Sequence, residues 1–243
     1  MSDYIRKAIA RLGHRMRGGG RPGGGRVNAY VSRAAYFNVL TLLSTFAVGL
    51  AVDAEGVLGK PTARVLALGD SIMAGYGLPA ADSLPSRLEA ALREGGFAVE
   101  VINGGVSGDT TAGGLARLDW MLADRPDLVI VELGGNDGLR GLDPKESYAN
   151  LDKILTKLDE AKIKVLLTGM LAPPNLGAEY DREFDAIFPE LAKRHGCLLY
   201  PFILDGVAAM PELNQPDGIH PNARGVEVIV GRLAPYVERA LGS

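Results

Sequence analysis

The stretch RVLALGDSI, residues 64–72, decides the fold of this 243-residue chain. Its apolar part, residues 65–68, is continuous rather than alternating, which is typical of a strand buried on both faces of a sheet. A glycine and two small polar residues, Gly69-Asp70-Ser71, then end the run. In sheets built from such strands, ligands bind where the carboxyl ends of the strands meet. The loop that contains Ser71 is therefore a place to look for chemistry.

The same kind of apolar run recurs along the chain. Further runs are found at residues 99–102, 128–133, 165–168 and 198–199. Between them, and at the C-terminal end, apolar residues recur every three or four positions, which indicates amphipathic helices. These helical segments are residues 84–93, 111–122, 144–161, 179–194 and 223–241. The alternation of strand and helix predicts an α/β protein with a five-stranded parallel sheet and helices on both faces.

The overall composition is that of an ordinary globular domain, with 47% hydrophobic and 23% charged residues. It excludes a disordered, collagen-like or disulfide-stapled protein. The single cysteine, Cys197, cannot form an intramolecular disulfide, so cysteine usage indicates no particular redox compartment.

Charge is distributed unevenly along the chain. Residues 1–34 contain eight arginines and lysines and one aspartate, so this segment carries a formal charge of +7. Because the whole chain carries −3, the remainder carries −10. An acidic main domain argues against binding to nucleic-acid phosphates.

The N-terminal region has the organisation of an export signal. Glycine triplets interrupt the arginines, and an apolar run over residues 37–52 is followed by Asp53-Ala54. Small residues at Ala51 and Ala54 predict a secretory signal with cleavage after Ala54. Because the basic region is unusually long, two alternatives stay open. They are an uncleaved inner-membrane anchor, since about 17 residues can just span a bilayer, and a start codon placed too far upstream.

These features predict the domain organisation. Residues 1–54 form a basic low-complexity segment plus a signal peptide or membrane anchor, residues 55–63 a linker, and residues 64–243 the folded domain. Positive charge before an apolar run is what membrane orientation requires. We therefore expect a protein that is periplasmic or secreted after signal cleavage, or one that is anchored in the inner membrane and faces the periplasm, with residues 34–52 near the membrane.

Two more strand ends resemble the first. The run at 99–102 leads into GGVSGDT, residues 104–110, and the run at 128–133 leads into GGND, residues 134–137. Glycine at such a turn lets a substrate approach backbone N–H groups, which are unpaired at a helix N-terminus. We expect Asp109 to cap the helix that follows it. The convergence of three such turns on one sheet edge predicts a functional site.

The three histidines narrow the choice of a general base. His14 lies in the basic N-terminal segment, and His195 precedes Gly196 at a helix end, where we expect it to interact with the last carbonyls of that helix. This leaves His220. Asp217 lies three residues before it, so one turn of chain can bring the carboxylate to the imidazole N–H.

Together the candidate residues define a hypothesis for nucleophilic catalysis. Ser71 would attack an acyl carbon, and His220, held by Asp217, would accept the Ser71 proton and return it to the leaving group. The backbone N–H groups of Ser71 and Gly108 and the side-chain amide of Asn136 are candidate donors to the oxyanion. A non-catalytic binding module with the same fold is the alternative, and the presence of all five residues argues against it.

This set of residues resembles the SGNH or GDSL hydrolase family. The family pattern has Ser in a first block, Gly in a second, Asn in a third and Asp-x-x-His in a last, which here correspond to Ser71, Gly108, Asn136, and Asp217 with His220. The stretches SGDT (107–110), VELGGNDGLRG (131–141) and DGIHPN (217–222) more narrowly resemble the bacterial periplasmic acyl-CoA thioesterase, lysophospholipase and arylesterase branch. The resemblance covers roughly residues 64–241. Ile72 stands where the family pattern has Leu, a conservative change.

The resemblance implies a serine esterase or thioesterase on a flavodoxin-like three-layer α/β/α sandwich. It also implies a small-molecule acyl ester or thioester substrate, no metal, no cofactor and no obligate protein partner. The apolar loop 170–175 follows the fourth apolar run at the same sheet edge, so Met170, Leu171 and Pro174 are candidates for the wall of an acyl pocket. Simple packing of this loop on the core is the alternative.

Other motif-based functions fit less well. The sequence GYGLPA, residues 75–80, formally fits GxGxxA, but it begins well past the first strand and contains Pro79, so it is misplaced for a dinucleotide site. The GxSxG motif of α/β-hydrolases is absent around Ser71. Among enzymes, the alternative is a carbohydrate O-acetyl esterase, which would use the same triad on a short acyl group.

Overall fold

The structure is a computed structural model that describes residues 63–242. The predicted segment 1–54, with its signal peptide or anchor, lies outside the described residues, as does the predicted linker except for Ala63.

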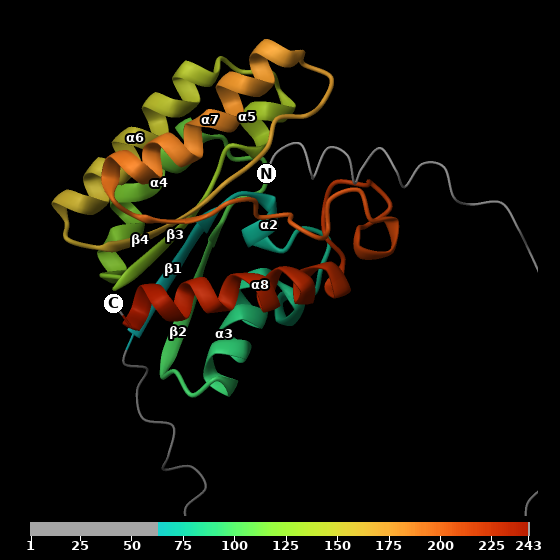
Figure 1. Cartoon of the computed structure of the whole chain (residues 1–243). Coiled ribbons are helices and arrows are strands. Elements are labelled where there is room, and N and C mark those ends of the chain that lie inside the picture. The colour runs from blue at the N-terminus through green and yellow to red at the C-terminus, as the bar shows by residue number, and fades with distance from the viewer. Residues whose placement is uncertain (1–62, 243) are drawn as a thin grey trace, which may run out of the picture. The chain divides into compact units, whose positions relative to one another are not determined.

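Five strands and a set of helices alternate along the described chain (Figure 1). The strands are β1 (Ala63–Gly69), β2 (Val99–Gly105), β3 (Leu128–Glu132), β4 (Lys164–Thr168) and β5 (Leu198–Tyr200). The α-helices are α2 (Ser71–Ala74), α3 (Leu84–Glu94), α4 (Thr111–Met121), α5 (Gly135–Leu139), α6 (Pro144–Glu160), α7 (Ala178–His195) and α8 (Ala223–Gly242). Short 3₁₀ turns are η1 (Ala80–Asp82), η2 (Leu122–Asp124) and η3 (Pro211–Leu213).

The strands form one parallel sheet in the order β2-β1-β3-β4-β5. Helices α3 and α8 cover one face of this sheet, and α4, α6 and α7 cover the other (Figure 1). The α/β class and the three-layer sandwich predicted from the sequence are confirmed. Within residues 63–242, no helix combines the length and the apolar character needed to cross a membrane.

The core lies where the apolar runs of the sequence placed it. All residues of β3 are buried, as are Val65 to Leu68 of β1, because helices cover both faces of the sheet. The long helices bury one stripe each, and α3 and α6 begin at polar caps. Ser83 accepts a hydrogen bond from the N–H of Ser86 at the start of α3, and Asp143 accepts one from Lys145 at the start of α6.

The cap of α4 corrects one expectation from the sequence. Thr110, not Asp109, is the N-cap residue, and its hydroxyl accepts a hydrogen bond from the N–H of Gly113 at 3.3 Å. Asp109 instead pairs with Arg117, with 2.6 Å between Oδ2 and Nε. An arginine two turns into the helix competes for the carboxylate, and the sequence pattern of a cap does not contain that information.

Two short helices follow strands after only one or two connecting residues. Helix α2 begins two residues after β1, and α5 begins three residues after β3. Helix α2 can pack closely against β2 because β2 ends in glycine. A Cβ on Gly105 would overlap the backbone of Met73 and Ala74, so α2 lies directly against the end of β2.

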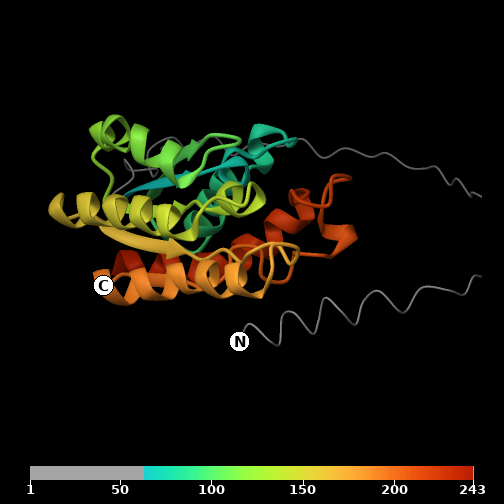
Figure 2. The same cartoon turned by 90° about the horizontal axis from the view of Figure 1, so that it is seen from above.

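In this sheet, β1 lies between β2 and β3, so the chain continues from β1 toward one edge of the sheet and from β3 toward the other edge. Chain segments leaving β1 and β3 diverge there and open a crevice at the carboxyl ends of the strands, the usual ligand-binding position in such sheets. Figure 2 shows that residues 201–222, between β5 and α8, project beyond these strand ends. The crevice is thus bordered by segments that are far apart in the sequence.

Candidate active site

Ser71 occupies the first position of α2, at the sharp turn that follows β1. The Asp70 side chain caps this helix by accepting a hydrogen bond from the N–H of Ile72 at 3.0 Å. Gly75, with φ of 74°, ends the helix after a single turn. The backbone N–H of Ser71 has no acceptor among residues 63–242, so it remains available to a ligand.

The structure brings Ser71, His220 and Asp217 into one line of contacts. Ser71 Oγ lies 2.9 Å from Nε2 of His220, and Nδ1 of the same ring lies 2.7 Å from Oδ2 of Asp217. A carboxylate at Nδ1 holds the proton of a neutral imidazole on that nitrogen. Nε2 then accepts the hydrogen bond that the Ser71 hydroxyl donates. This arrangement can withdraw a proton from Ser71 as the hydroxyl attacks an electrophile.

Asp217 is held as a carboxylate by the turn that contains it. Its Oδ1 accepts hydrogen bonds from the backbone N–H groups of Ile219 at 2.9 Å and His220 at 3.0 Å. The backbone and side-chain hydrogen bonds from His220, followed by that from Ile219, lower the pKa of Asp217 to about 2. The carboxylate therefore stays charged beside the imidazole over a wide pH range.

Gln215 and Tyr76 connect the His220 turn to the segment that follows α2. The Gln215 side chain donates from Nε2 to the carbonyl oxygens of Tyr76 at 2.7 Å and Pro221 at 3.0 Å, and its backbone N–H donates to the His220 carbonyl. The Tyr76 ring lies 4.6 Å from the His220 ring, centroid to centroid. The sequence analysis assigned no role to Gln215. Its only signal was proximity to Asp217 in the chain.

The other two predicted oxyanion donors lie on neighbouring strand ends. Gly108 has φ of 85°, a conformation that favours glycine, and its N–H has no acceptor among residues 63–242. Nδ2 of Asn136, in α5, donates to Asp70 Oδ2 at 3.0 Å and to the Asp109 carbonyl at 2.9 Å. The side-chain amide thus ties the ends of β1, β2 and β3 together.

Comparison with known proteins identifies the family. The profile of the GDSL-like Lipase/Acylhydrolase family matches residues 67–228, which include Ser71, Gly108, Asn136, Asp217 and His220. The chain belongs to this family. The resemblance stated from the sequence motifs is therefore confirmed, and with it the class of ester-hydrolysing enzymes.

Individual relatives of this GDSL-family chain agree. An arylesterase from Vibrio mimicus is 46% identical over 159 residues, covering 65% of this chain and 80% of the relative. Thioesterase 1/protease 1/lysophospholipase L1 from Escherichia coli is 42% identical over 175 residues, covering 72% and 83%. The crystal structure of AlinE4, an SGNH-hydrolase family esterase, is 53% identical with a TM-score of 0.63, covering 74% of this chain and 96% of that one.

Arg117 links the strand ends around the GDSL serine. From α4 its guanidinium donates to the carbonyls of Gly69 at 2.9 Å and Gly104 at 2.7 Å, and it pairs with Asp109. The residue before the Ser71 turn and the loop that contains Gly108 are thereby fixed to one helix. Sequence analysis missed this residue because an arginine within a helix pattern is ordinarily a solvated one.

Asp137 fixes the position of Asn136 from the other side. Its side chain is buried, and its oxygens accept hydrogen bonds from the Thr111 N–H at 2.9 Å, the Thr111 hydroxyl at 2.6 Å and the Ser147 hydroxyl at 3.0 Å. The start of α5 is thus attached to α4 and α6. A charged side chain that is saturated with hydrogen bonds in this way rigidifies the loop around it.

One cavity of about 490 Å³ is lined by the candidate site residues of this GDSL-family chain. Ser71, Gly108, Asn136 and His220 line it, whereas Asp217 contacts His220 from outside the lining. The three candidates for the acyl-pocket wall, Met170, Leu171 and Pro174, line it as well. The segment after β5 also lines the cavity, with Phe202, Leu204, Ala208 and Ala209, and no sequence pattern indicated these residues.

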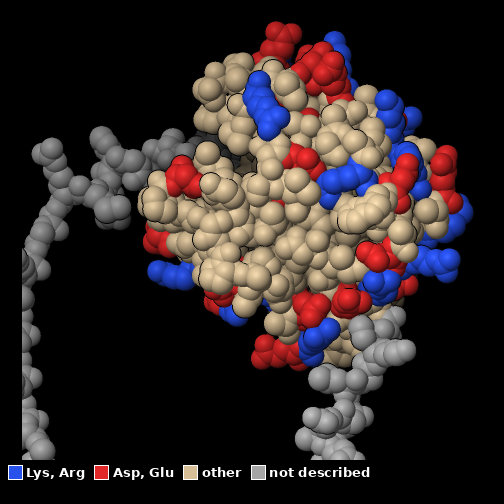
Figure 3. Space-filling view, turned by 180° about the vertical axis from the view of Figure 1, so that it is seen from behind, with Lys and Arg blue, Asp and Glu red and all other residues tan. Residues whose placement is uncertain are grey.

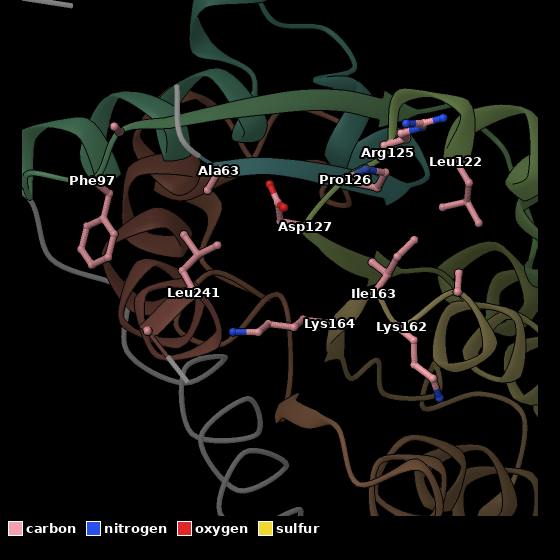
Figure 4. A pocket seen from close by; sticks show the side chains of 13 residues that line it. Ala63, Phe97, Leu122, Arg125, Pro126, Asp127, Lys162, Ile163, Lys164 and Leu241 are labelled. Carbon is pink, nitrogen blue, oxygen red and sulfur yellow. The ribbon is translucent and has the colours of Figure 1, made fainter. Parts of the chain in front are cut away.

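A second, larger cavity of about 830 Å³ lies elsewhere (Figure 4). Ala63, Ala98, Asp127 and Lys164 line it, and these residues stand at the amino ends of β1, β2, β3 and β4. In parallel strands the amino ends lie opposite the carboxyl ends, so this cavity is at the far edge of the sheet from Ser71. No residue lines both this cavity and the cavity that contains Ser71.

Charge on the surface is mixed. On the face drawn in Figure 3, acidic and basic side chains of the described residues are interspersed around a broad uncharged area. This face has no continuous basic patch of the kind that nucleic-acid backbones require.

Within residues 63–242, no group of three or more His, Cys, Asp or Glu side chains is placed to hold a metal ion.

His195 lies away from the site, as the sequence indicated, but its side chain contacts a different partner from the one expected. It is the last residue of α7, and Gly196 in the left-handed region follows it. Its Nε2 lies 2.8 Å from Oδ1 of Asp152 in α6, rather than at the last carbonyls of its own helix. Helix packing between α6 and α7 provides this partner, and local sequence could not reveal it.

Proposed function

We propose that the protein is a serine hydrolase that cleaves carboxylic ester and thioester bonds of acyl substrates, of the arylesterase, acyl-CoA thioesterase or lysophospholipase type. The observation that carries the proposal is the continuous contact from Ser71 Oγ through the His220 ring to Asp217. Relatives named arylesterase and thioesterase/lysophospholipase support the same chemistry.

The reaction proceeds through an acyl-enzyme. Ser71 Oγ forms a bond to the acyl carbon while His220 Nε2 takes the hydroxyl proton, and the Asp217 carboxylate stabilises the resulting imidazolium. The tetrahedral intermediate collapses, the bond to the leaving oxygen or sulfur breaks, and His220 returns the proton to the leaving alcohol or thiol. Water then repeats both steps and releases the carboxylic acid and free Ser71.

The negative oxygen of the intermediate is stabilised by donors from three strand ends. The N–H groups of Ser71 and Gly108 have no acceptor among the described residues and are free to donate. The Asn136 amide is the third donor, and it shares its hydrogens with Asp70 and Asp109. Prepositioned donors need no reorganisation during the reaction, which is why each is worth about 3 to 4 kcal/mol of barrier.

The acyl chain occupies the apolar side of the cavity. Met170, Leu171 and Pro174 line it from the loop after β4, and Phe202 and Leu204 line it from the segment after β5. Exposed apolar side chains of Tyr76, Leu139 and Ile219 line the same cavity. An apolar cavity with convergent polar groups at one end is the usual form of a site for a small substrate with one reactive bond.

Hydrolysis of p-nitrophenyl esters from acetate to decanoate by the full chain tests the proposal, with acyl-CoA thioesters assayed by release of free thiol. We expect turnover that disappears in Ser71→Ala. The matched control is Ser86→Ala, since Ser86 is an exposed serine at the start of α3 that does not line the Ser71 cavity. Equal turnover by Ser71→Ala and the unchanged chain would overturn the proposal.

The chain-length profile separates the proposed substrates from the alternative. An optimum at medium or long chains supports a fatty-acyl substrate, whereas activity confined to acetate esters favours a carbohydrate O-acetyl esterase that uses the same triad. A folded protein without turnover on any ester or thioester would favour a binding module.

We further propose that residues 64–243 form the catalytic domain and that residues 1–54 direct export to the periplasm, with cleavage near Ala54. The basic segment and the apolar run 37–52 support this proposal. Expression in a secreting bacterium, followed by fractionation and intact mass measurement, tests it. A mature protein beginning near Glu55 is expected, and full-length chain in the membrane fraction would favour the uncleaved anchor.

A further inference from the structure

A buried carboxyl group lies beneath the nucleophile turn and takes no part in the chemistry described above. Glu132 is the last residue of β3 and pairs in register with Gly69, the residue before Asp70. Its side chain is 1% exposed. Oε2 accepts a hydrogen bond from the Asp70 N–H at 3.2 Å, whereas Oε1 is buried without a partner among the described residues. Burial of a polar oxygen without a hydrogen-bond partner costs free energy, so this group calls for an explanation.

The space for this carboxyl is built into the turn. A Cβ on Gly69 would overlap Oε2 of Glu132 and the Met73 side chain. Gly69 is therefore required for the close approach of Glu132 to the backbone that enters α2. The contact joins the two strand ends, β1 and β3, between which the crevice opens.

Asp70, the neighbour of Glu132, is itself connected to the reacting groups. Its side chain is 2% exposed, and its Oδ1 accepts the Ile72 N–H while Oδ2 accepts the Asn136 amide. Ser71 Oγ lies 3.5 Å from Oδ1. Any movement of Asp70 therefore shifts the Ser71 turn and the Asn136 amide together.

The two buried carboxyls cannot both be ionised without a large cost. Neither forms an ion pair with a basic side chain among the described residues. Besides Asp70, the charged groups near this turn are Arg117, which donates to the Gly69 carbonyl from α4, and His220, which faces Asp70. Like charges in one buried site favour protonation of one of the two carboxyl groups.

The environments of the two carboxyls place that proton. Burial, followed by the charge of Asp70, raises the pKa of Glu132 well above its usual value. Burial also raises the pKa of Asp70, but hydrogen bonds from Ile72 and Asn136 and the charge of His220 oppose that rise. Asp70 accepts the hydrogen bonds that stabilise a carboxylate, so Asp70 is the anion and Glu132 is the neutral partner.

We propose that Glu132 is a positioning residue for ester hydrolysis, which as a neutral carboxylic acid accepts the Asp70 N–H, and so fixes both the Ser71 turn and the Asn136 amide. The first part of this inference, the effect of Glu132 on kcat, rests on the proposed function. Its second part, the protonation of Glu132 in the folded protein, is measurable without any activity.

Three variants of the full chain test the proposal. Glu132→Gln keeps the shape and an acceptor for the Asp70 N–H, but cannot ionise. Glu132→Leu has a similar volume and no such acceptor. Thr168→Val is the matched control, because Thr168 is a buried residue at the end of the adjacent strand β4 whose hydroxyl donates to the Val131 carbonyl at 3.3 Å.

Rescue by the amide variant is the expected kinetic result. The kcat of Glu132→Gln and of Thr168→Val stays within about threefold of the unchanged chain, whereas Glu132→Leu loses about 30-fold or more in kcat with KM changed by less than about threefold. A kcat loss in Glu132→Gln as large as in Glu132→Leu would overturn the proposal, because an ionised carboxylate would then be needed. Full kcat in Glu132→Leu would overturn it too.

The pH dependence of stability tests the proton directly. A carboxyl with a raised pKa in the folded state stabilises the fold fully below its unfolded pKa of about 4.5 and loses that contribution as the pH rises through the folded pKa. The melting temperature of the unchanged chain therefore falls more between pH 5 and pH 8 than that of Glu132→Gln. Equal falls in both proteins would show an ionised Glu132 and overturn the proposal.

The two failures are distinguishable. If no ester or thioester is hydrolysed, the proposed function fails, and the melting experiment still decides the protonation of Glu132. If Glu132→Leu does not fold, the kcat of Glu132→Gln and the melting experiment decide. A large loss of kcat in Glu132→Gln, or equal falls in the melting temperature of the two proteins, then overturns the proposal.

Discussion

Ser71 and His220 are 149 positions apart in the chain, yet Oγ of the first lies 2.9 Å from Nε2 of the second. The distance depends on how the segment before α8 is attached to the segment after α2. Gln215 provides that attachment by donating to the carbonyls of Tyr76 and Pro221. The geometry of the nucleophile and its base is thus controlled by a side chain that touches neither of them.

Replacement of Gln215 should therefore slow the reaction. We expect Gln215→Ala to lower kcat by about 10-fold or more, since small misplacements of reacting groups have large effects on rate. Glu212→Ala is the control, because the Glu212 residue is exposed in the same segment. Steady-state kinetics on one ester measures both. An unchanged kcat in Gln215→Ala would show that the His220 turn holds its position without this contact.

Asp217→Asn should reduce catalysis much further. The amide can present a hydrogen-bond donor to Nδ1 of His220, which favours the wrong tautomer and removes the charge that stabilises the imidazolium. We expect kcat to fall by about 10³- to 10⁴-fold. Far-ultraviolet circular dichroism checks that the fold is intact. A loss of less than tenfold would contradict the role given to this carboxylate.

Asp217 should also contribute to acid stability. Its pKa is lowered to about 2 in the folded protein from 3.8, so its contribution is present above the unfolded value and lost as the pH falls through about 2. We expect melting temperatures measured from pH 4 to pH 2 to fall less steeply for Asp217→Asn than for the unchanged chain. Parallel curves would indicate that the carboxylate gains nothing from its backbone contacts.

Asn136→Ala should lower kcat by about 10²- to 10³-fold, the cost of one missing oxyanion donor. KM should change little, because the donor acts on charge that develops only in the transition state. Asn150→Ala is the control, since Asn150 is a partly buried asparagine that donates to the Thr111 hydroxyl. An increase in KM at constant kcat would mean that Asn136 binds the ground state instead.

Gly105→Ala should disturb both the fold and the site. The added Cβ would overlap the backbone of Met73 and Ala74, and α2 carries Ser71. We expect a loss of about 1 to 3 kcal/mol in the free energy of unfolding and a lower kcat. Gly231→Ala is the control, because a Cβ there meets no atom within 4 Å. Equal melting temperatures for the two variants would contradict this packing argument.

The sequence predicted the fold well because its signals were local. Continuous runs such as 128–133 and periodic segments such as 144–161 need no knowledge of distant residues, and the structure places β3 at Leu128–Glu132 and α6 at Pro144–Glu160. The short helices α2 and α5 were not predicted, because one or two turns contain too few residues for a periodic pattern.

The site was predicted only where residue type limits the choice. Ser71, Asn136 and His220 could be found because few residues can act as nucleophile, amide donor or base, and the structure brings them to one cavity. Arg117 and Glu132 could not, because their roles come from tertiary contacts with strand-end carbonyls and N–H groups. A glutamate within the apolar run 128–133 was the available signal for Glu132.

The position of the base near the end of the chain has a consequence for synthesis. Ser71 and its oxyanion donors belong to the first half of the described chain, whereas Asp217 and His220 lie in the turn just before α8. A chain still being made, or one cut before that turn, contains a nucleophile without a base. Acyl bonds in the cell that makes the protein are therefore safe from it until its last helix has been completed and folded into place.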